Sequence, residues 1–218
     1  MSADQPTGRY TPFARVYDLL SLEWAVYRTG RVAAIGAMRL RTGQCVLDVG
    51  CGTGLSMPWL AAAVGPTGHV IGVDASPAML RRAGRRRLVA PRTLVRADAT
   101  SLRAENILAP HEATGPDTVP PPQAALFCYA LSLMRPWEDA WRSVTRLLAP
   151  GSRVAVVDVA LPGRGGLLAR TAAKTAASIG GADPDAHPWR ALERECEQVR
   201  HHERWGGHVQ VWSGTLRA

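Results

Sequence analysis

The stretch VLDVGCGTG at residues 46–54 constrains the fold of this 218-residue chain more than any other feature. The apolar run CVLDVG at 45–50 is typical of a short strand that is buried on both faces of a parallel sheet. The glycines that follow allow the backbone to turn sharply and let a ligand approach without a Cβ atom in the way. A helix is predicted over residues 55–64, before Gly65-Pro66. The pattern therefore predicts a strand, a ligand-binding loop and a helix in direct succession.

Further along the chain, buried-type apolar runs alternate with helical patterns in the same rhythm. Strands are predicted at 69–74, 92–97, 124–130 and 153–161, and helices at 77–87, near 101–108 and at 137–148. Two extended stretches at about 196–203 and 208–216 flank Gly206-Gly207 and indicate a hairpin. This alternation predicts an α/β fold, and a length of 218 residues fits one domain.

Three segments fall outside this alternation. Apolar residues at steps of three and four indicate amphipathic helices over 13–27 and 167–179. The proline-rich residues 109–122 are expected to form a surface loop before the fourth strand.

The composition of the chain and its pattern of apolar residues indicate the compartment in which the protein is expected. No basic segment with a following apolar stretch opens the chain, and no apolar run is long enough to cross a bilayer, so a cytoplasmic protein is expected. The four cysteines are scattered without a C-x-x-C pair or histidines at metal-binding spacing. A reduced, metal-free protein is the simplest interpretation.

The net charge of +8 has two interpretations. Dense positive charge attracts phosphate groups, which fits an anionic membrane or a nucleic acid. However, 25 of the 26 basic residues are arginines, which is typical of a compositional bias of the source genome. The five arginines of the helix at 77–87 are interpreted as a solvated face. No RNA-binding module is recognisable, so no nucleic-acid partner is expected.

Acidic residues at the ends of the predicted strands indicate what the glycine loop binds. The spacing G-x-G-x-G is one residue shorter than the loop that holds a dinucleotide pyrophosphate, which disfavours NAD. Asp48 is costly inside a buried strand unless it has a partner, and a ligand ammonium group would be one. Asp74 ends the second strand, where a carboxylate can accept hydrogen bonds from both ribose hydroxyls. Asp98 and Ala99 end the third strand, where they can meet an adenine amino group.

VLDVGCGTG followed by VIGVDASPAML resembles the class I S-adenosylmethionine-dependent methyltransferases, over nearly the whole chain. The resemblance implies a Rossmann-like, seven-stranded, mostly parallel sheet with helices on both faces and an antiparallel C-terminal strand. It implies S-adenosylmethionine as cofactor and S-adenosylhomocysteine as product. It places the methionine moiety at Asp48 and the glycine loop, the ribose at Asp74, and the adenine near Met79 and Asp98-Ala99. The full predicted cofactor set is Asp48, Gly50, Cys51, Gly52, Thr53, Gly54, Asp74, Ala75, Met79, Asp98, Ala99 and Tyr129.

Within this class, FARVYDLLS at 13–21, YALSLMRPW at 129–137 and the terminal GGHVQVWSG are most similar to two bacterial subgroups. These are the phosphatidylethanolamine N-methyltransferases with their betaine-lipid relatives, and the quinone-ring C-methyltransferases. The resemblance implies that Tyr17 helps to cover the acceptor, although a core aromatic residue fits the same pattern. Tyr17 and Tyr129 are the candidate catalytic residues. Gln123 replaces the acid often found at the head of the fourth strand, and residues 163–205 match neither subgroup.

Several functions follow from this resemblance. The first is methylation of a small-molecule or lipid-like acceptor, most readily at an amine nitrogen. The alternative is carbon or oxygen methylation of a quinol-like ring or a secondary metabolite, which needs a base within about 3 Å of the acceptor. A protein that binds the cofactor without methyl transfer is the alternative of another class. His187, His201 and His202 are candidate bases, with a surface or strand-lining role favoured for each.

The resemblance also divides the single domain into three parts. Residues 1–42 are expected to form an N-terminal helical lid, 43–161 the cofactor-binding core, and 162–218 the substrate-side helices and the C-terminal hairpin. The basic balance and the two amphipathic segments predict peripheral contact with the inner, anionic face of a membrane.

Overall fold

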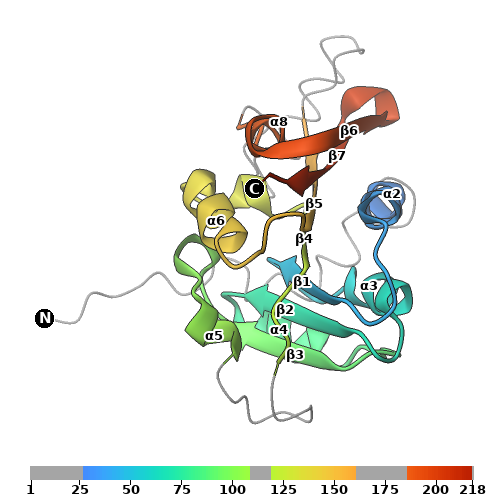
Figure 1. Cartoon of the computed structure of the whole chain (residues 1–218), viewed down its shortest axis with the longest axis vertical. Helices are drawn as coiled ribbons and strands as arrows, with labels where there is room; N and C mark the ends of the chain where they lie inside the picture. Colours follow the sequence, from blue (N-terminus) through green and yellow to red (C-terminus); the bar gives the residue numbers. More distant parts are fainter. Residues whose placement is uncertain (1–26, 109–118, 161–185, 218) are drawn as a thin grey trace, which may run out of the picture.

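The computed structural model describes residues 27–108, 119–160 and 186–217, which form a seven-stranded sheet in the order β3-β2-β1-β4-β5-β7-β6 (Figure 1). The strands are β1 (Cys45–Val49), β2 (His69–Asp74), β3 (Arg92–Arg96), β4 (Ala124–Cys128), β5 (Arg153–Val159), β6 (Cys196–Arg204) and β7 (Val209–Leu216). The pairings among β1 to β5 are parallel, and β7 runs antiparallel between β5 and β6. This confirms the predicted fold class, including the antiparallel C-terminal strand.

Helices cover both faces of the sheet. They are α2 (Tyr27–Met38), α3 (Met57–Val64), α4 (Pro77–Ala83), α5 (Ala104–Leu108), α6 (Trp137–Thr145) and α8 (Arg190–Glu195), with 3-10 turns η1 (Ala99–Ser101), η2 (Leu131–Leu133) and η3 (Trp205–Gly207). Buried residues of α2, α3 and α4 share one core with the sheet, whereas α5, α6 and α8 share the other. Figure 1 shows α2 and α3 on the right of the sheet and α5 and α6 on the left.

Apolar burial explains why the central strands form. All five residues of β1 and the five central residues of β5 are buried, as the near-continuous apolar runs predict for strands covered on both sides. On the α6 side, the rings of Phe127 and Trp141 stack with centroids 5.9 Å apart. Among the described residues, no helix has the length and apolarity needed to cross a bilayer.

Some predicted boundaries were wrong, for local reasons. Helix α4 ends at Ala83 rather than at 87. The backbone amides of Arg85 and Arg86 donate hydrogen bonds to carbonyls three residues earlier, which tightens the turn. The helix near 101–108 splits into η1 and α5. Strand β4 stops at Cys128, since Tyr129 adopts a φ of 54°. Helices α2 and α8 were not predicted as such, and the predicted helices over 13–27 and 167–179 lie outside the described residues apart from Tyr27.

Replacing Gly30 with alanine is expected to destabilise the protein by about 1–3 kcal/mol, the usual cost of overpacking. A Cβ atom there would collide with the Tyr129 hydroxyl and lie 2.7 Å from Cγ1 of Val209. Gly36→Ala on the same helix is the matched control. Its Cβ would meet nothing within 4 Å, so alanine's helix propensity should stabilise by about 0.5–1 kcal/mol. Urea unfolding measures both, and shifts of the same sign would contradict this packing of α2.

Candidate cofactor-binding site

The glycine loop lies at the carboxyl end of β1 and is held against its neighbours by backbone bonds. The Cys51 amide donates to the Val73 carbonyl of β2 at 2.9 Å, and the Gly54 amide donates to the Cys51 carbonyl at 2.9 Å. Arg86 Nε donates to the Thr53 carbonyl at 3.0 Å, which ties the loop to the turn after α4. The loop is therefore held in place by β2 and by the turn after α4.

Asp74 is oriented by two backbone donors. Its Oδ2 accepts from the Gly52 amide and its Oδ1 from the Ser76 amide, each at 2.8 Å. Burial raises the pKa of Asp74, while the bonds from Ser76 and Gly52 lower it. Each carboxylate oxygen has lone pairs for a further hydrogen bond. The side chain can thus accept from two neighbouring hydroxyls, as expected for a ribose, with exposed Ala75 beside it.

Asp48 is a buried acid whose charge lacks a local hydrogen bond. The residue is 1% exposed, and neither carboxylate oxygen has a hydrogen-bond partner within the described part of the chain. Burial raises the pKa of Asp48 to about 7, against a lowering by Arg31 and a further rise from Asp74. Arg31 is itself buried and donates from Nε to Ser56 Oγ at 3.2 Å. An orphaned carboxylate beside an open glycine loop fits a ligand that brings an ammonium group.

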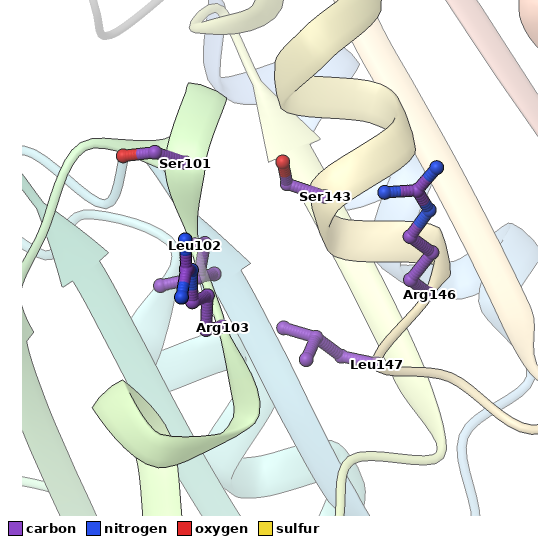
Figure 2. A pocket seen from close by; sticks show the side chains of 6 residues that line it. All are labelled: Ser101, Leu102, Arg103, Ser143, Arg146 and Leu147. Atoms are coloured by element: carbon purple, nitrogen blue, oxygen red, sulfur yellow. The ribbon is translucent and has the colours of Figure 1, made fainter.

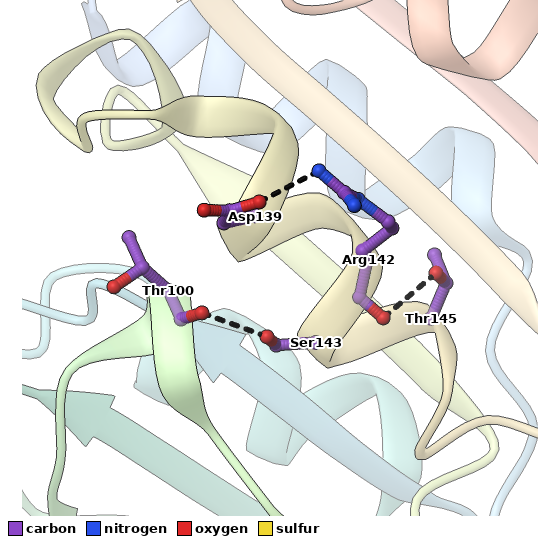
Figure 3. Close-up of polar contacts among 5 residues, drawn as sticks. All are labelled: Thr100, Asp139, Arg142, Ser143 and Thr145. Atoms are coloured by element: carbon purple, nitrogen blue, oxygen red, sulfur yellow. Dashed lines mark hydrogen bonds and ion pairs between the residues drawn. The ribbon is translucent and has the colours of Figure 1, made fainter.

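Asp98 and Ala99, which were predicted from the sequence to contact the adenine of the cofactor, follow strand β3. Asp98 Oδ1 accepts from the Thr100 amide at 2.9 Å and from its hydroxyl at 2.8 Å, so this acid caps η1. Ser143 Oγ of α6 donates to the Thr100 carbonyl at 2.9 Å (Figure 3). Met79 and Ala99 are nearly buried, on the first turn of α4 and in η1. These contacts fix the backbone around Asp98 and Ala99.

Residues after β4 adjoin the glycine loop. A Cβ atom on Gly50 would lie 2.7 Å from Ala130 Cβ and 2.8 Å from Met134 Cε, so only glycine allows this approach. The Tyr129 amide donates to Val157, and its hydroxyl donates to the Tyr27 carbonyl at 2.9 Å. The two tyrosine rings meet edge to face at 5.0 Å. Tyr129 therefore links the end of β4 to the start of α2.

A shallow hollow of about 440 Å³ opens on this side of the site. It is lined by Ser132, Met134, Arg135, Pro136, Trp137 and Ala186. Met134 lines this hollow and reaches toward Gly50. The hollow is therefore the best candidate for the acceptor side of the site. A second hollow, of about 360 Å³, lies between η1 and α6 and is lined by Ser101, Leu102, Arg103, Ser143, Arg146 and Leu147 (Figure 2). It shares no residue with the glycine loop, and we assign it no part in the cofactor site.

Asp158 is a further buried acid, which was not among the predicted site residues. Its Oδ2 accepts from the Ser132 amide at 2.9 Å and its Oδ1 from the Ser132 hydroxyl at 2.7 Å. Burial raises its pKa, and the bonds from Ser132 and Val159 lower it. The signal was present, because an acid inside the apolar run RVAVVDVAL is as anomalous as Asp48 in its own strand. Asp158 thereby positions η2, which borders the hollow.

Other predicted residues take different places. His201 Nε2 lies 2.6 Å from Gln210 Oε1, and its ring stacks on Trp212 at 4.0 Å, whereas His202 is exposed on β6. His187 is next in sequence to Ala186 of the hollow and packs edge-on to Trp189. Gln123 Oε1 accepts from the Cys45 amide at 3.2 Å, which links β1 to β4 at their amino ends. Tyr17 lies outside the described residues.

Sequence comparisons point to one family. The family model described as a methyltransferase domain matches residues 46–151. The ubiquinone/menaquinone biosynthesis C-methyltransferase UbiE of Ectopseudomonas mendocina is 31% identical over 152 residues, covering 69% of this chain and 56% of the relative. The 2-phytyl-1,4-naphtoquinone methyltransferase of Synechococcus elongatus is 30% identical over 168 residues, covering 74% of this chain and 66% of the relative. The chain thus spans between half and two thirds of the length of these curated relatives.

The fold agrees with a solved structure of the same kind. The crystal structure of a SAM dependent methyltransferase from Aquifex aeolicus matches with a TM-score of 0.58 at 16% identity, covering 94% of this chain and 98% of that one. The matched family model contains the glycine loop, Asp74 and the end of β4 described above. With the sequence relatives and the strand order, this places the chain in a family: it belongs to the class I S-adenosylmethionine-dependent methyltransferases.

Proposed function

We propose that this protein transfers a methyl group from S-adenosylmethionine to a small acceptor with a quinol-like ring. The observation that carries the proposal is the pair of acids around the glycine loop. Asp48 is buried without a hydrogen-bond partner among the described residues, and Asp74 is held by two backbone amides at 2.8 Å. One fits the ammonium group of the cofactor and the other its ribose hydroxyls. The sequence relatives, which are quinone methyltransferases by name, support the choice of acceptor.

The protein's part in this reaction is binding and alignment. The cofactor supplies a methyl group on a positively charged sulfur, which leaves as a neutral thioether once an acceptor atom attacks in line. Asp48 and Asp74 would hold the two ends of the cofactor, while the Gly50–Met134 contact joins that site to the acceptor hollow. Fixing both reactants in line is worth several kcal/mol of the barrier, of the order of 7–11 kcal/mol in the best intramolecular cases.

A ring acceptor must also lose a proton, from a hydroxyl or from the carbon that is methylated. His187 is our candidate to take it, since it is next in sequence to Ala186, which lines the hollow, and an imidazole nitrogen can accept a proton. Tyr129 is less suited to this role, because its hydroxyl already donates to the Tyr27 carbonyl. We place Tyr129 as a positioning residue between β4 and α2.

An amine nitrogen, as in a phospholipid headgroup, is the acceptor that the sequence motifs favour. The relatives that match over most of this chain favour the ring instead, and we rank the ring first. Incubation with labelled S-adenosylmethionine and matched acceptors decides between them. A demethylated naphthoquinol should accept label and phosphatidylethanolamine should not. Label in the phospholipid alone would reverse the ranking, and cofactor binding without label in a broad acceptor panel would indicate a binding protein without transfer.

Replacing Asp74 with asparagine is expected to weaken S-adenosylmethionine binding about tenfold, because hydrogen bonds to a charged acceptor are worth roughly 1.5 kcal/mol or more. Asparagine keeps one carbonyl oxygen and so preserves part of the contact to the Ser76 or Gly52 amide. Titration calorimetry measures the affinity, with Glu105→Gln on exposed α5 as the charge-matched control. An unchanged affinity in the Asp74 variant would remove this residue from the site.

We further propose a cytoplasmic location with peripheral contact to a membrane, because a ring acceptor with a phytyl-like chain would be held in a bilayer. The amphipathic segments 13–27 and 167–179, which motivated this idea in the sequence, lie outside the described residues except for Tyr27.

A further inference from the structure

The two helical layers of the fold differ sharply in charge. The layer of α2, α3 and α4, with the turns that join them to the sheet (27–44, 50–68 and 75–91), contains nine arginines and no aspartate or glutamate. The opposite layer (97–108, 129–152 and 186–195) contains six arginines and six acids. A genome-wide arginine bias would raise the charge of both layers alike. The positive charge of the described residues is instead concentrated on one face.

Five arginines of the first layer are accessible. Arg39, Arg41, Arg81, Arg85 and Arg87 are all exposed, and none has an ion pair within the described residues. Among the described residues, the acids nearest in sequence to these segments are Asp48 on β1 and Asp74 on β2, and both belong to the proposed cofactor site, behind this layer. These five arginines therefore have no acidic partner in the described part of the fold.

Large apolar side chains are exposed between these arginines. Val32 on α2, Trp59 on α3 and Val89 after α4 are 41%, 40% and 65% exposed. The Arg28 guanidinium lies over the Trp59 ring, 5.4 Å from its centroid. A tryptophan and aliphatic residues among arginines suit the boundary between lipid headgroups and acyl chains, where the apolar parts enter and the charges stay in the headgroup region.

We propose that the layer of α2, α3 and α4 docks on an anionic lipid bilayer. A bilayer fits better than a nucleic acid, because a phosphate backbone would neutralise the arginines and leave Val32 and Val89 in water. The end of this layer that carries Arg28 and Trp59 also borders the proposed cofactor site. Helix α3 starts directly after the glycine loop, and α2 starts at Tyr27, whose carbonyl accepts from Tyr129. The face thus presents the acceptor side of the site to the membrane.

The inference deepens the proposed function, because a membrane-held acceptor gives the docking a purpose, but its test needs no turnover. The experiment is co-sedimentation of the full chain with phosphatidylglycerol vesicles and with phosphatidylcholine vesicles, in 0.1 M and 1 M salt. The protein should bind the anionic vesicles in low salt, and binding should fade in high salt as the Debye length falls from about 10 Å to about 3 Å.

Matched triple variants locate the surface. Arg81, Arg85 and Arg87 changed together to glutamine should lower vesicle binding about a hundredfold, at about fivefold for each arginine near the membrane. Arg103, Arg146 and Arg190 changed to glutamine remove the same charge from the opposite layer and should change binding less than about threefold. Thermal unfolding and S-adenosylmethionine affinity confirm that both variants are folded.

Trp59→Ala separates a bilayer from a simple polyanion. This variant should lose about fivefold in vesicle binding and keep its affinity for a single-stranded RNA probe. Equal losses in both triple variants, no sedimentation with phosphatidylglycerol, or an RNA affinity above that for vesicles would each overturn the proposal. None of these outcomes would contradict methyl transfer to a soluble acceptor. Conversely, a lack of methyltransferase activity would not contradict the binding of vesicles.

Discussion

Gly52→Ala is expected to lower the affinity for S-adenosylmethionine at least about a hundredfold while the protein still folds. Gly52 has a φ of 54°, its amide donates to Asp74, and a Cβ atom there would meet nothing within 4 Å. That open space is where a ligand must approach the loop, so the added methyl group would occupy the ligand's place. The strain of a left-handed alanine is about 1–2 kcal/mol, too little to unfold a stable domain.

Gly151→Ala is the matched control for Gly52→Ala. Gly151 has a φ of 83°, and its Cβ would likewise meet nothing within 4 Å, but it lies in the turn between α6 and β5, at the amino end of the strand. It should show a similar loss of stability in thermal unfolding and an unchanged affinity in calorimetry. Should both variants keep full affinity, the loop would not be the cofactor site.

Cofactor affinity should rise roughly fiftyfold between pH 5 and pH 7 and level off above, because Asp48 must be ionised to hold an ammonium group. Burial raises the pKa of Asp48 to about 7, so only a small fraction is charged at pH 5. Arg31 from α2 opposes this shift and Asp74 from β2 adds to it. Cys51 stays neutral throughout, since burial raises its thiol pKa well above the ordinary value. Calorimetry in buffers of different ionisation enthalpy should also detect release of one proton on binding at pH 6.

Asp48→Asn tests this assignment. The variant should bind weakly at every pH, with the steep part of the pH profile removed. The stability of the unsubstituted protein without cofactor should depend on pH in the opposite direction to its cofactor affinity. The folded-state pKa of about 7 lies above the ordinary 3.8, so the folded protein binds the extra proton and its free energy of unfolding falls as pH rises between these values. The asparagine variant should lack this fall, and an unaltered pH dependence would assign the titration to another group.

The central strands and the glycine loop could be predicted because each depends on a local pattern. The runs CVLDV, HVIGVD and RVAVVDV are apolar almost throughout, and in the structure they are strands covered on both sides. The hairpin was recognisable from the glycines between its strands, and Gly206 and Gly207 do have positive φ values. The places of Asp48 and Asp74 followed from their position at or near the ends of such strands.

The remaining features depend on contacts between distant segments. Helix α2 was missed because Gly30 and Gly36 interrupt its pattern, although Gly30 is required where the helix meets Tyr129. Asp158 and Ser132 are 26 residues apart, and only the fold brings them together. The arginine-rich face was invisible in the composition, because the layer to which a residue belongs is decided by the order of the strands.

The C-terminal hairpin also decides how the protein behaves when it is shortened. Strand β7 pairs with all seven residues of β5, while β6 forms the outer border and displays mostly charged or polar side chains, with an irregularity between Glu197 and Arg200. Charges and bulges on an outer strand discourage pairing with another molecule. Without the hairpin, the apolar RVAVVDV strand would become the border and offer an unpaired backbone to its neighbours. A truncation before Cys196 would therefore turn a sheet with a protected edge into a template for aggregation.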